Sequence, residues 1–208
     1  MRKARLAAGE IKRERESKAA IVASILYGSA PEAPSEFPYL VAKQVQRHTA
    51  RLVGDRLALP IQDFSGNLTS LQFISRIGDK RMLTGGRKKG CFIPIDGQPG
   101  DHGIVIVCEG WATGATLAEE YPTSSVIAAI DAGNLKSVAT GAAIKWPNAE
   151  LVVAGDDDRS TSVNIGREKA SEAAKLAGAK LVFPQWPEGA PLELSDFNDL
   201  ALYQRSAA

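Results

Sequence analysis

The chain has 208 residues, of which 44% are hydrophobic and 24% charged, as in a soluble globular protein of one or two domains. No apolar run approaches the roughly 18 to 20 residues that span a bilayer, and the basic N-terminus lacks the apolar core of a signal peptide. Cys91 and Cys108 are far apart and only two histidines accompany them, a pattern that excludes a paired zinc-ligand spacing. We therefore expect a cytoplasmic protein with reduced thiols and no membrane contact.

The net charge of +1 conceals two regions of opposite sign. Residues 43–89 hold ten Lys/Arg and three Asp/Glu, whereas residues 90–208 hold eight Lys/Arg and sixteen Asp/Glu. A basic lobe beside an acidic one suits a polyanion gripped on one side and metal ions on the other. The alternative is that two solvated faces simply differ in charge.

The first 36 residues predict a helix followed by a linker. Residues 2–26 mix charged residues and alanine with irregularly spaced apolar ones, which is typical of a mostly exposed helix. The cations of this helix could touch nucleic acid, although a solvated linker helix is the simpler interpretation. Residues 28–38 are rich in Pro, Ser and Gly, which indicates a linker.

Residues 37–100 predict a small basic α+β subdomain. From Tyr39, a short helix is expected to carry Lys43, Arg47, His48 and Arg51. Two strands, residues 57–61 and 68–77, flank turn-forming residues and predict a hairpin.

A basic, glycine-rich run follows the hairpin over residues 80–90. Its five cations are Lys80, Arg81, Arg87, Lys88 and Lys89. Glycines let the backbone approach phosphate while the cations neutralise it, which predicts a phosphate-binding loop. The Gly-Lys-Ser/Thr ending of a Walker A loop is missing. Taken alone, the run fits a flexible surface turn nearly as well.

Residues 101–208 predict one α/β domain, because apolar strands alternate with helices. The expected strands are residues 104–108, 125–130, 151–154 and 180–183, and the helices are residues 111–121, 134–144 and 164–177, with a last helix starting near Asp196. Repeated strand–helix–strand units indicate a parallel sheet with right-handed crossovers.

Three consecutive acids follow the third predicted strand. Leu151 to Ala154 is the apolar pattern of a buried parallel strand, and Asp156, Asp157 and Asp158 lie just past its end. Ligands of open α/β sheets lie outside the carboxyl ends of the strands. Three adjacent carboxylates repel one another unless a cation lies between them, and Mg²⁺ prefers carboxylate oxygen. The alternative is turn and helix-capping chemistry, for which Asp is common.

Glu109 ends the first strand of this domain. It can share a metal site with Asp156 only if strands one and three are neighbours, which predicts the strand order 2-1-3-4. That order places the topological switch point, where such folds bind ligands, between strands one and three. An acidic cluster without His or Cys suits phosphoryl or nucleotidyl chemistry.

These acidic segments together resemble a known family. A strand ending in Glu109-Gly110, a strand running into Asp156-Asp157-Asp158, and the later run Asp196-Phe197-Asn198-Asp199 resemble the TOPRIM domain of primases and topoisomerases. Residues 82–90 are similar to the segment that precedes TOPRIM in phage- and plasmid-type primases. The resemblance implies an α/β fold, a TOPRIM four-stranded parallel sheet flanked by helices and preceded by the basic α+β subdomain.

The resemblance also implies residue roles. Asp156 and Asp158 would bind Mg²⁺, or Mn²⁺, with Asp157 in the variable position between them, and Glu109 would bind metal or act as general base on a 3′-hydroxyl. Asp196 and Asp199 would complete the acidic patch. The residues expected to hold single-stranded DNA template or ribonucleoside triphosphate are Lys80, Arg81, Arg87, Lys88 and Lys89, with Arg47, Arg51, Arg167 and Lys169 as further candidates. For the last two, ordinary solvated helix charges are the alternative.

The activity implied by the resemblance is that of a DNA primase core, which synthesises short RNA primers in DNA replication. Two alternatives stay open: a TOPRIM nuclease, in which water replaces the 3′-hydroxyl, and a nucleic-acid-binding module that catalyses nothing. Relatives of this kind usually carry an N-terminal zinc-binding domain, and often a helicase motor, and the sequence contains neither. We therefore expect a replicative helicase and a zinc-binding module as partners, on a longer protein or on other chains.

Overall fold

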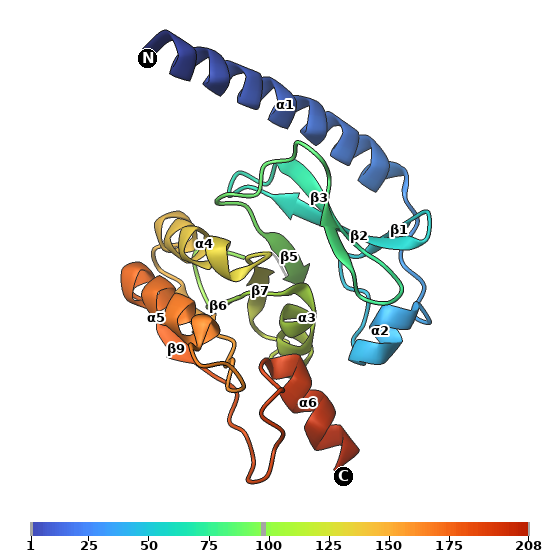
Figure 1. Cartoon of the computed structure of the whole chain (residues 1–208), viewed down its shortest axis with the longest axis vertical. Coiled ribbons are helices and arrows are strands. Elements are labelled where there is room, and N and C mark those ends of the chain that lie inside the picture. The colour runs from blue at the N-terminus through green and yellow to red at the C-terminus, as the bar shows by residue number, and fades with distance from the viewer. Residues whose placement is uncertain (1, 97–98, 208) are drawn as a thin grey trace.

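The computed structural model describes residues 2–96 and 99–207. Helix α1 (Arg2–Ser29) lies along a first, antiparallel sheet, and a second sheet carries the later helices (Figure 1). Within the described residues, no helix combines the length and the apolar character needed to cross a membrane.

The first sheet has the order β1-β2-β3-β4, with all neighbours antiparallel. Its strands are β1 (Arg51–Val53), β2 (Arg56–Gln62), β3 (Leu68–Ile74) and β4 (Lys80–Met82). The predicted hairpin is β2–β3. The start of the basic run, predicted as loop, is strand β4, because Lys80 to Met82 pair with the end of β3.

Helix α2 (Pro38–Lys43) is shorter than predicted. Gln44 adopts a left-handed conformation, with φ 50°, and ends the helix there. Arg47 therefore lies in the loop beyond the helix and Arg51 begins β1, so the prediction that a helix carries both residues was wrong.

The segment between α1 and α2 was predicted as a linker, but it is packed into the protein. Ala33 and Phe37 are almost fully buried. The backbone N–H of Ala33 donates to the carbonyl of Ala50, and the Arg51 guanidinium donates to the Tyr27 carbonyl. This Pro- and Ser-containing segment is therefore an ordered connection packed against the first sheet and not a flexible linker.

The second sheet has the order β5-β7-β6-β8-β9. Its strands are β5 (Ile93–Asp96), β6 (Ile104–Cys108), β7 (Ser125–Ala128), β8 (Glu150–Ala154) and β9 (Lys180–Val182). The four parallel strands follow the predicted order 2-1-3-4. The prediction of four strands missed β5, which pairs antiparallel with the outer edge of β7. Strand β5 could not be assigned from the sequence, because it is short, contains a proline and shows no clear alternation of apolar and polar residues.

Helices cover both faces of the second sheet. They are α3 (Trp111–Glu120), α4 (Ala132–Lys145), α5 (Ile165–Ala177) and α6 (Phe197–Ser206). Along β6, Val105 and Val107 face the core beneath α4 and α5, whereas Ile106 and Cys108 face the core beneath α3. This alternation is the expected pleat of a strand buried on both faces.

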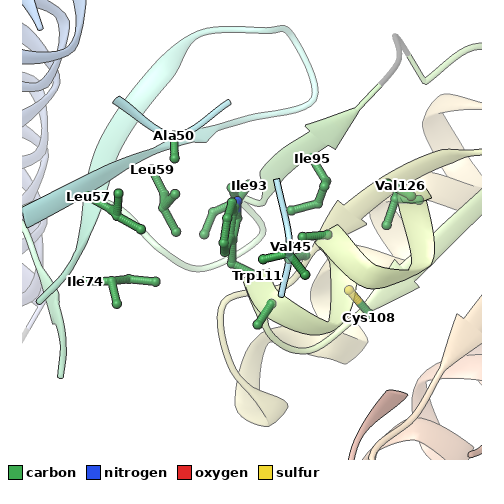
Figure 2. Packing of buried hydrophobic residues seen from close by; sticks show 14 of the residues in the cluster. Val45, Ala50, Leu57, Leu59, Ile74, Ile93, Ile95, Cys108, Trp111 and Val126 are labelled. Atoms are coloured by element: carbon green, nitrogen blue, oxygen red, sulfur yellow. The ribbon is translucent and has the colours of Figure 1, made fainter. Parts of the chain in front are cut away.

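One hydrophobic core joins the two sheets. Trp111, 1% exposed, lies between Leu57 and Ile74 of the first sheet and Cys108 and Val126 of the second (Figure 2). Met82 of β4 packs on the same core. The first sheet is thus fixed against the edge of the second sheet where the acidic residues lie.

Candidate active site

The strand register brings Glu109 and Asp156 to the same edge of the second sheet. Strands β6 and β8 are parallel with Cys108 paired to Ala154, so the two acids follow one and two residues beyond a paired position. Burial, together with the charges of Glu109, Asp196 and Asp158, raises the pKa of Asp156 to about 8, although Lys80 acts to lower it. Carboxylates from three separate segments therefore interact at one place, as the predicted strand order requires.

Glu109 lies at the N-terminus of α4. Burial is the main cause that raises the pKa of Glu109, and the charges of Asp158 and Asp131 raise it too. The nearby backbone N–H of Ala132, the first residue of α4, lowers the pKa of this carboxylate, as does the charge of Lys80. The helix end thus supplies partial positive charge to an otherwise repulsive position.

Asp158 is held at the N-terminus of α5. Its Oδ2 accepts the backbone N–H of Gly166 at 2.8 Å, and its own N–H donates to Asn164 Oδ1 at 3.0 Å. Both bonds fix the turn after β8, so the orientation of Asp158 is determined by the start of the helix.

Asp157, between the two acids of the cluster, faces the protein interior and is 7% exposed. Its carboxylate accepts Asn164 Nδ2 at 2.8 Å, Arg167 Nε at 3.1 Å and Trp186 Nε1 at 3.2 Å. The middle position of the acidic run is therefore structural, because it ties β8, α5 and the segment around Trp186 together.

Asp196 and Asp199 begin α6. Asp196 Oδ1 caps the helix by accepting the Asp199 N–H at 2.8 Å, and Oδ2 accepts the Thr113 hydroxyl at 3.1 Å. Burial and the charge of Asp199 raise the pKa of Asp196. Asp199 Oδ2 accepts the Ser195 N–H, and Lys43 Nζ lies 3.6 Å from Oδ1. Asp196 faces the cluster, whereas Asp199 is engaged at the helix start.

Lys80 is the predicted cation that the structure brings to the acids. It lies on the same face of β4 as Met82, which packs on the shared core. Its Nζ is 3.9 Å from the position that a Cβ atom would take at Gly110, and its charge lowers the pKa of both Glu109 and Asp156. Arg81, the next residue, points to the opposite face.

The other cations of the basic run have different surroundings. Arg87 Nη2 pairs with Asp63 Oδ2 at 2.6 Å, and Lys88 pairs with Asp131, the N-cap of α4. Lys89 is exposed. Lys88 is therefore linked to the start of α4, which lies near Glu109.

The remaining candidates lie elsewhere. Arg51 donates to the Tyr27 carbonyl and stacks on its ring, and Arg47 lines a pocket of about 890 Å³ with Glu119, at the far end of α3 from Glu109. Arg167 pairs with Asp157 and stacks on Phe183, 4.1 Å from the ring centre. Lys169 is exposed on α5. Arg47, Arg51 and Lys169 are therefore not gathered at the acidic cluster, and Arg167 contacts only Asp157, the inward-facing acid.

Two functional candidates, Lys43 and Arg76, were not predicted as site residues from the sequence. Lys43, Arg76 and Lys80 line one pocket of about 450 Å³, here called the basic pocket, together with Tyr39 and Leu202. Lys43 also contacts Asp199, and Lys80 faces the acids, so the basic pocket adjoins the cluster. Arg76 and Lys80 flank the β3–β4 turn, and that spacing was the available signal.

The acidic cluster fits a divalent cation. Asp156 Oδ1 is buried and has no hydrogen-bond partner, which is costly unless another group reaches it. Among the described residues, no three His, Cys, Asp or Glu side chains form a ready cage for a metal ion. Mg²⁺ is commonly held by one or two carboxylates together with substrate phosphates and water, so an open acidic site of this kind suits it.

Comparison with known families identifies the fold. The family model described as Toprim domain matches residues 104–207, and the chain belongs to that family. Two proteins of Escherichia coli called DNA primase TraC are 39% identical over 161 residues and 36% identical over 156 residues. The matches cover 73% and 71% of this chain but only 15% and 11% of those proteins.

Solved structures share the architecture beyond the family match. The primase fragment of the bacteriophage T7 primase-helicase has a TM-score of 0.60 at 16% identity, covering 81% of this chain and 70% of that one. The DnaG primase catalytic domain bound to single-stranded DNA has a TM-score of 0.57 at 15% identity, covering 94% and 76%. The predicted TOPRIM resemblance and α/β fold are confirmed.

Proposed function

We propose that this chain is the catalytic core of a DNA primase, which synthesises short RNA primers on single-stranded DNA in a metal-dependent, template-directed reaction. The observation that carries the proposal is the placement of Lys80, from the first sheet, at the carboxylates of the second. This placement supports the proposal, because it sets a cation suited to phosphate beside carboxylates suited to a divalent metal ion. The names of the curated relatives support the same activity.

The carboxylates divide the work of the reaction. Asp156 and Asp158 hold the divalent cation, and Asp196 completes the negative patch. When bound, Mg²⁺ or Mn²⁺ supplies charge neutralisation at the reacting phosphates. Glu109, whose pKa is raised by burial, accepts the proton of the attacking 3′-hydroxyl, because a base with a pKa nearer neutrality is the more effective one.

The cations bind the polyanionic substrates. The basic pocket, with Lys43, Arg76 and Lys80, is suited to the triphosphate of an incoming ribonucleotide beside the metal site. Arg81, Arg87, Lys88 and Lys89 remain candidates for the template strand. Asp199, held near Lys43, acts through that lysine rather than as a metal ligand.

The nuclease alternative would use water at the same carboxylates. The basic pocket favours synthesis, because cutting a strand requires no platform for a free nucleotide. A helicase and a zinc-binding module remain proposed partners, since the chain spans a small part of the length of its relatives. A cytoplasmic location is also a proposal.

The test is primer synthesis on single-stranded template with labelled ribonucleotides and Mg²⁺ or Mn²⁺. We expect template-dependent oligonucleotides from the wild type and none from Glu109→Gln or Asp156→Asn, with Glu193→Gln, an exposed acid, as matched control. Shortened template without synthesis would establish a nuclease. Salt-sensitive binding without chemistry would leave a binding module.

A further inference from the structure

The side chain of Asn134 joins the basic run to the second sheet. It is 2% exposed, on the first turn of α4. Its Oδ1 accepts the Gly90 N–H at 2.9 Å, and its Nδ2 lies 2.8 Å from the Cys91 carbonyl and 3.2 Å from the Lys88 carbonyl. A fourth contact, 2.9 Å from Nδ2 to the Ala129 carbonyl, anchors it to the end of β7.

This contact set requires an amide at position 134. The oxygen meets an N–H donor and the nitrogen meets three carbonyl acceptors, so the orientation of the amide is fixed by its partners. The polar backbone groups of Lys88 and Gly90 are partly buried and that of Cys91 is buried, so they need these partners, because unpaired buried polar groups are costly. No other residue type of this size supplies both a donor and an acceptor here.

The turn before α4 also approaches two residues of the candidate site, Lys88 and Glu109. Asp131 caps α4 by accepting the Asn134 N–H at 3.1 Å, and its other oxygen pairs with Lys88. The backbone N–H of the next residue, Ala132, lies near Glu109 and lowers the pKa of its carboxyl group. Ile130, just before, has a φ of 81°, a conformation that a β-branched residue adopts only when its surroundings impose it. The turn is therefore tightly specified.

We propose that Asn134 is a positioning residue, which sets the distance between the cation of Lys88 and the carboxylate of Glu109. It fixes the backbone at Lys88 directly, and it holds the start of α4, which approaches Glu109. Lys88 then meets phosphate of the template or nucleotide at a defined place relative to the base. This inference rests on the proposed function, and it assigns to a neutral, buried residue an effect on substrate binding.

Asn134→Asp is the most informative variant, because aspartate has the same shape as asparagine. It keeps an oxygen that accepts the Gly90 N–H, but it replaces the Nδ2 donor by a second oxygen. Three carbonyls then face a carboxylate oxygen, and the segment at Lys88 is released. We expect the KM for ribonucleotide to rise about tenfold while kcat changes by less than about threefold. Amide hydrogen exchange at Gly90 and Cys91 should accelerate. Lys145→Gln, at the other end of α4, is the matched control.

A double-mutant cycle separates positioning from general stability. Lys88→Met alone should weaken nucleotide or template binding, and Asn134→Asp should add less than about twofold in that background. A purely structural role for Asn134 predicts additive losses and equal falls in kcat and kcat/KM, and that result would overturn the proposal.

Asp131→Asn provides a variant that retains the fold. An asparagine at this position still caps α4, yet it loses the charge that pairs with Lys88. We expect weaker binding with an unchanged Tm; unchanged binding would contradict the proposal. Binding of labelled nucleotide and hydrogen exchange need no synthesis. If the wild type makes no primers, the proposed function fails while these two measurements still decide the role of Asn134.

Discussion

The Lys80 ammonium group and the Asp156 carboxylate belong to different sheets, and the charge of Lys80 lowers the pKa of Asp156. Burial and three neighbouring carboxylates act in the opposite direction and raise that pKa to about 8. The lysine is thus the counter-charge that the protein itself supplies to the acidic edge of the second sheet.

Replacing Lys80 should change both the rate and its pH dependence. In Lys80→Met, the pKa values of Asp156 and Glu109 rise further, so the acid limb of the pH–rate profile moves to higher pH. Activity at pH 7 should fall about ten- to a hundredfold, because a charge aimed at the reacting phosphates is lost. Arg81→Met should leave the acid limb in place, since its side chain points to the other face; a shift of the same size would contradict the assignment.

The raised pKa of Asp156 predicts a pH-dependent stability in the absence of metal. The folded state binds a proton that the unfolded state releases near pH 4, so stability falls as the pH rises from about 4 to about 8. Asp156→Asn removes this effect and should gain on the order of 2 kcal/mol relative to wild type at pH 8, and little at pH 4. Urea unfolding in EDTA at the two pH values measures the difference.

Adding Mg²⁺ should reverse the effect in the wild type. A cation bound by ionised Asp156 stabilises the folded state more at pH 8 than at pH 5, and removal by EDTA should lower Tm correspondingly. Asp156→Asn should respond weakly at either pH. An equal response of both proteins would place the cation elsewhere.

Substitution of Asp157 should mainly lower stability, whereas substitution of the adjacent Asp158 should mainly abolish activity. Asp157→Ala leaves Arg167, Asn164 and Trp186 without their shared partner and should destabilise the fold by about 2–4 kcal/mol. Asp158→Asn should change stability far less and abolish primer synthesis. Denaturant unfolding and the synthesis assay together separate the two roles. A stable, inactive Asp157→Ala would show that the middle acid has a direct part in the chemistry.

Gly166 allows α5 to approach the acidic turn. A Cβ atom there would lie 2.7 Å from the Asp156 carbonyl oxygen and 3.0 Å from Asp158 Oδ2. Gly166→Ala should therefore displace the turn, reduce stability by about 1–3 kcal/mol and impair metal binding. Gly28→Ala is the matched control, because nothing lies within 4 Å of the added carbon in α1. Calorimetry and Mg²⁺ titration check both variants.

The acidic half of the site could be predicted because it follows from strand topology. Glu109 and Asp156 each terminate an apolar strand, and parallel strands end at a common edge, so the chain order alone restricts where they meet. The same reasoning could not reveal that Asp157 faces inward, because its partner Trp186 lies in an irregular segment.

The basic half could be predicted only in part. The cations of residues 80–90 are evident in the sequence, but their partners, Asp63 for Arg87 and Asp131 for Lys88, lie in other elements. The helix expected to carry Arg47 ends early because Gln44 turns left-handed, which side-chain pattern does not signal. Contacts between distant elements determine which cation faces the acids, and the local pattern of side chains along the chain does not.

The burial of Trp111 between the sheets has a mechanical consequence. A swing of one lobe away from the other would have to expose this indole and its aliphatic neighbours to water, at a cost of several kcal/mol. The two sheets are consequently held in one fixed arrangement, and the position of Lys80 beside the carboxylates is held with it.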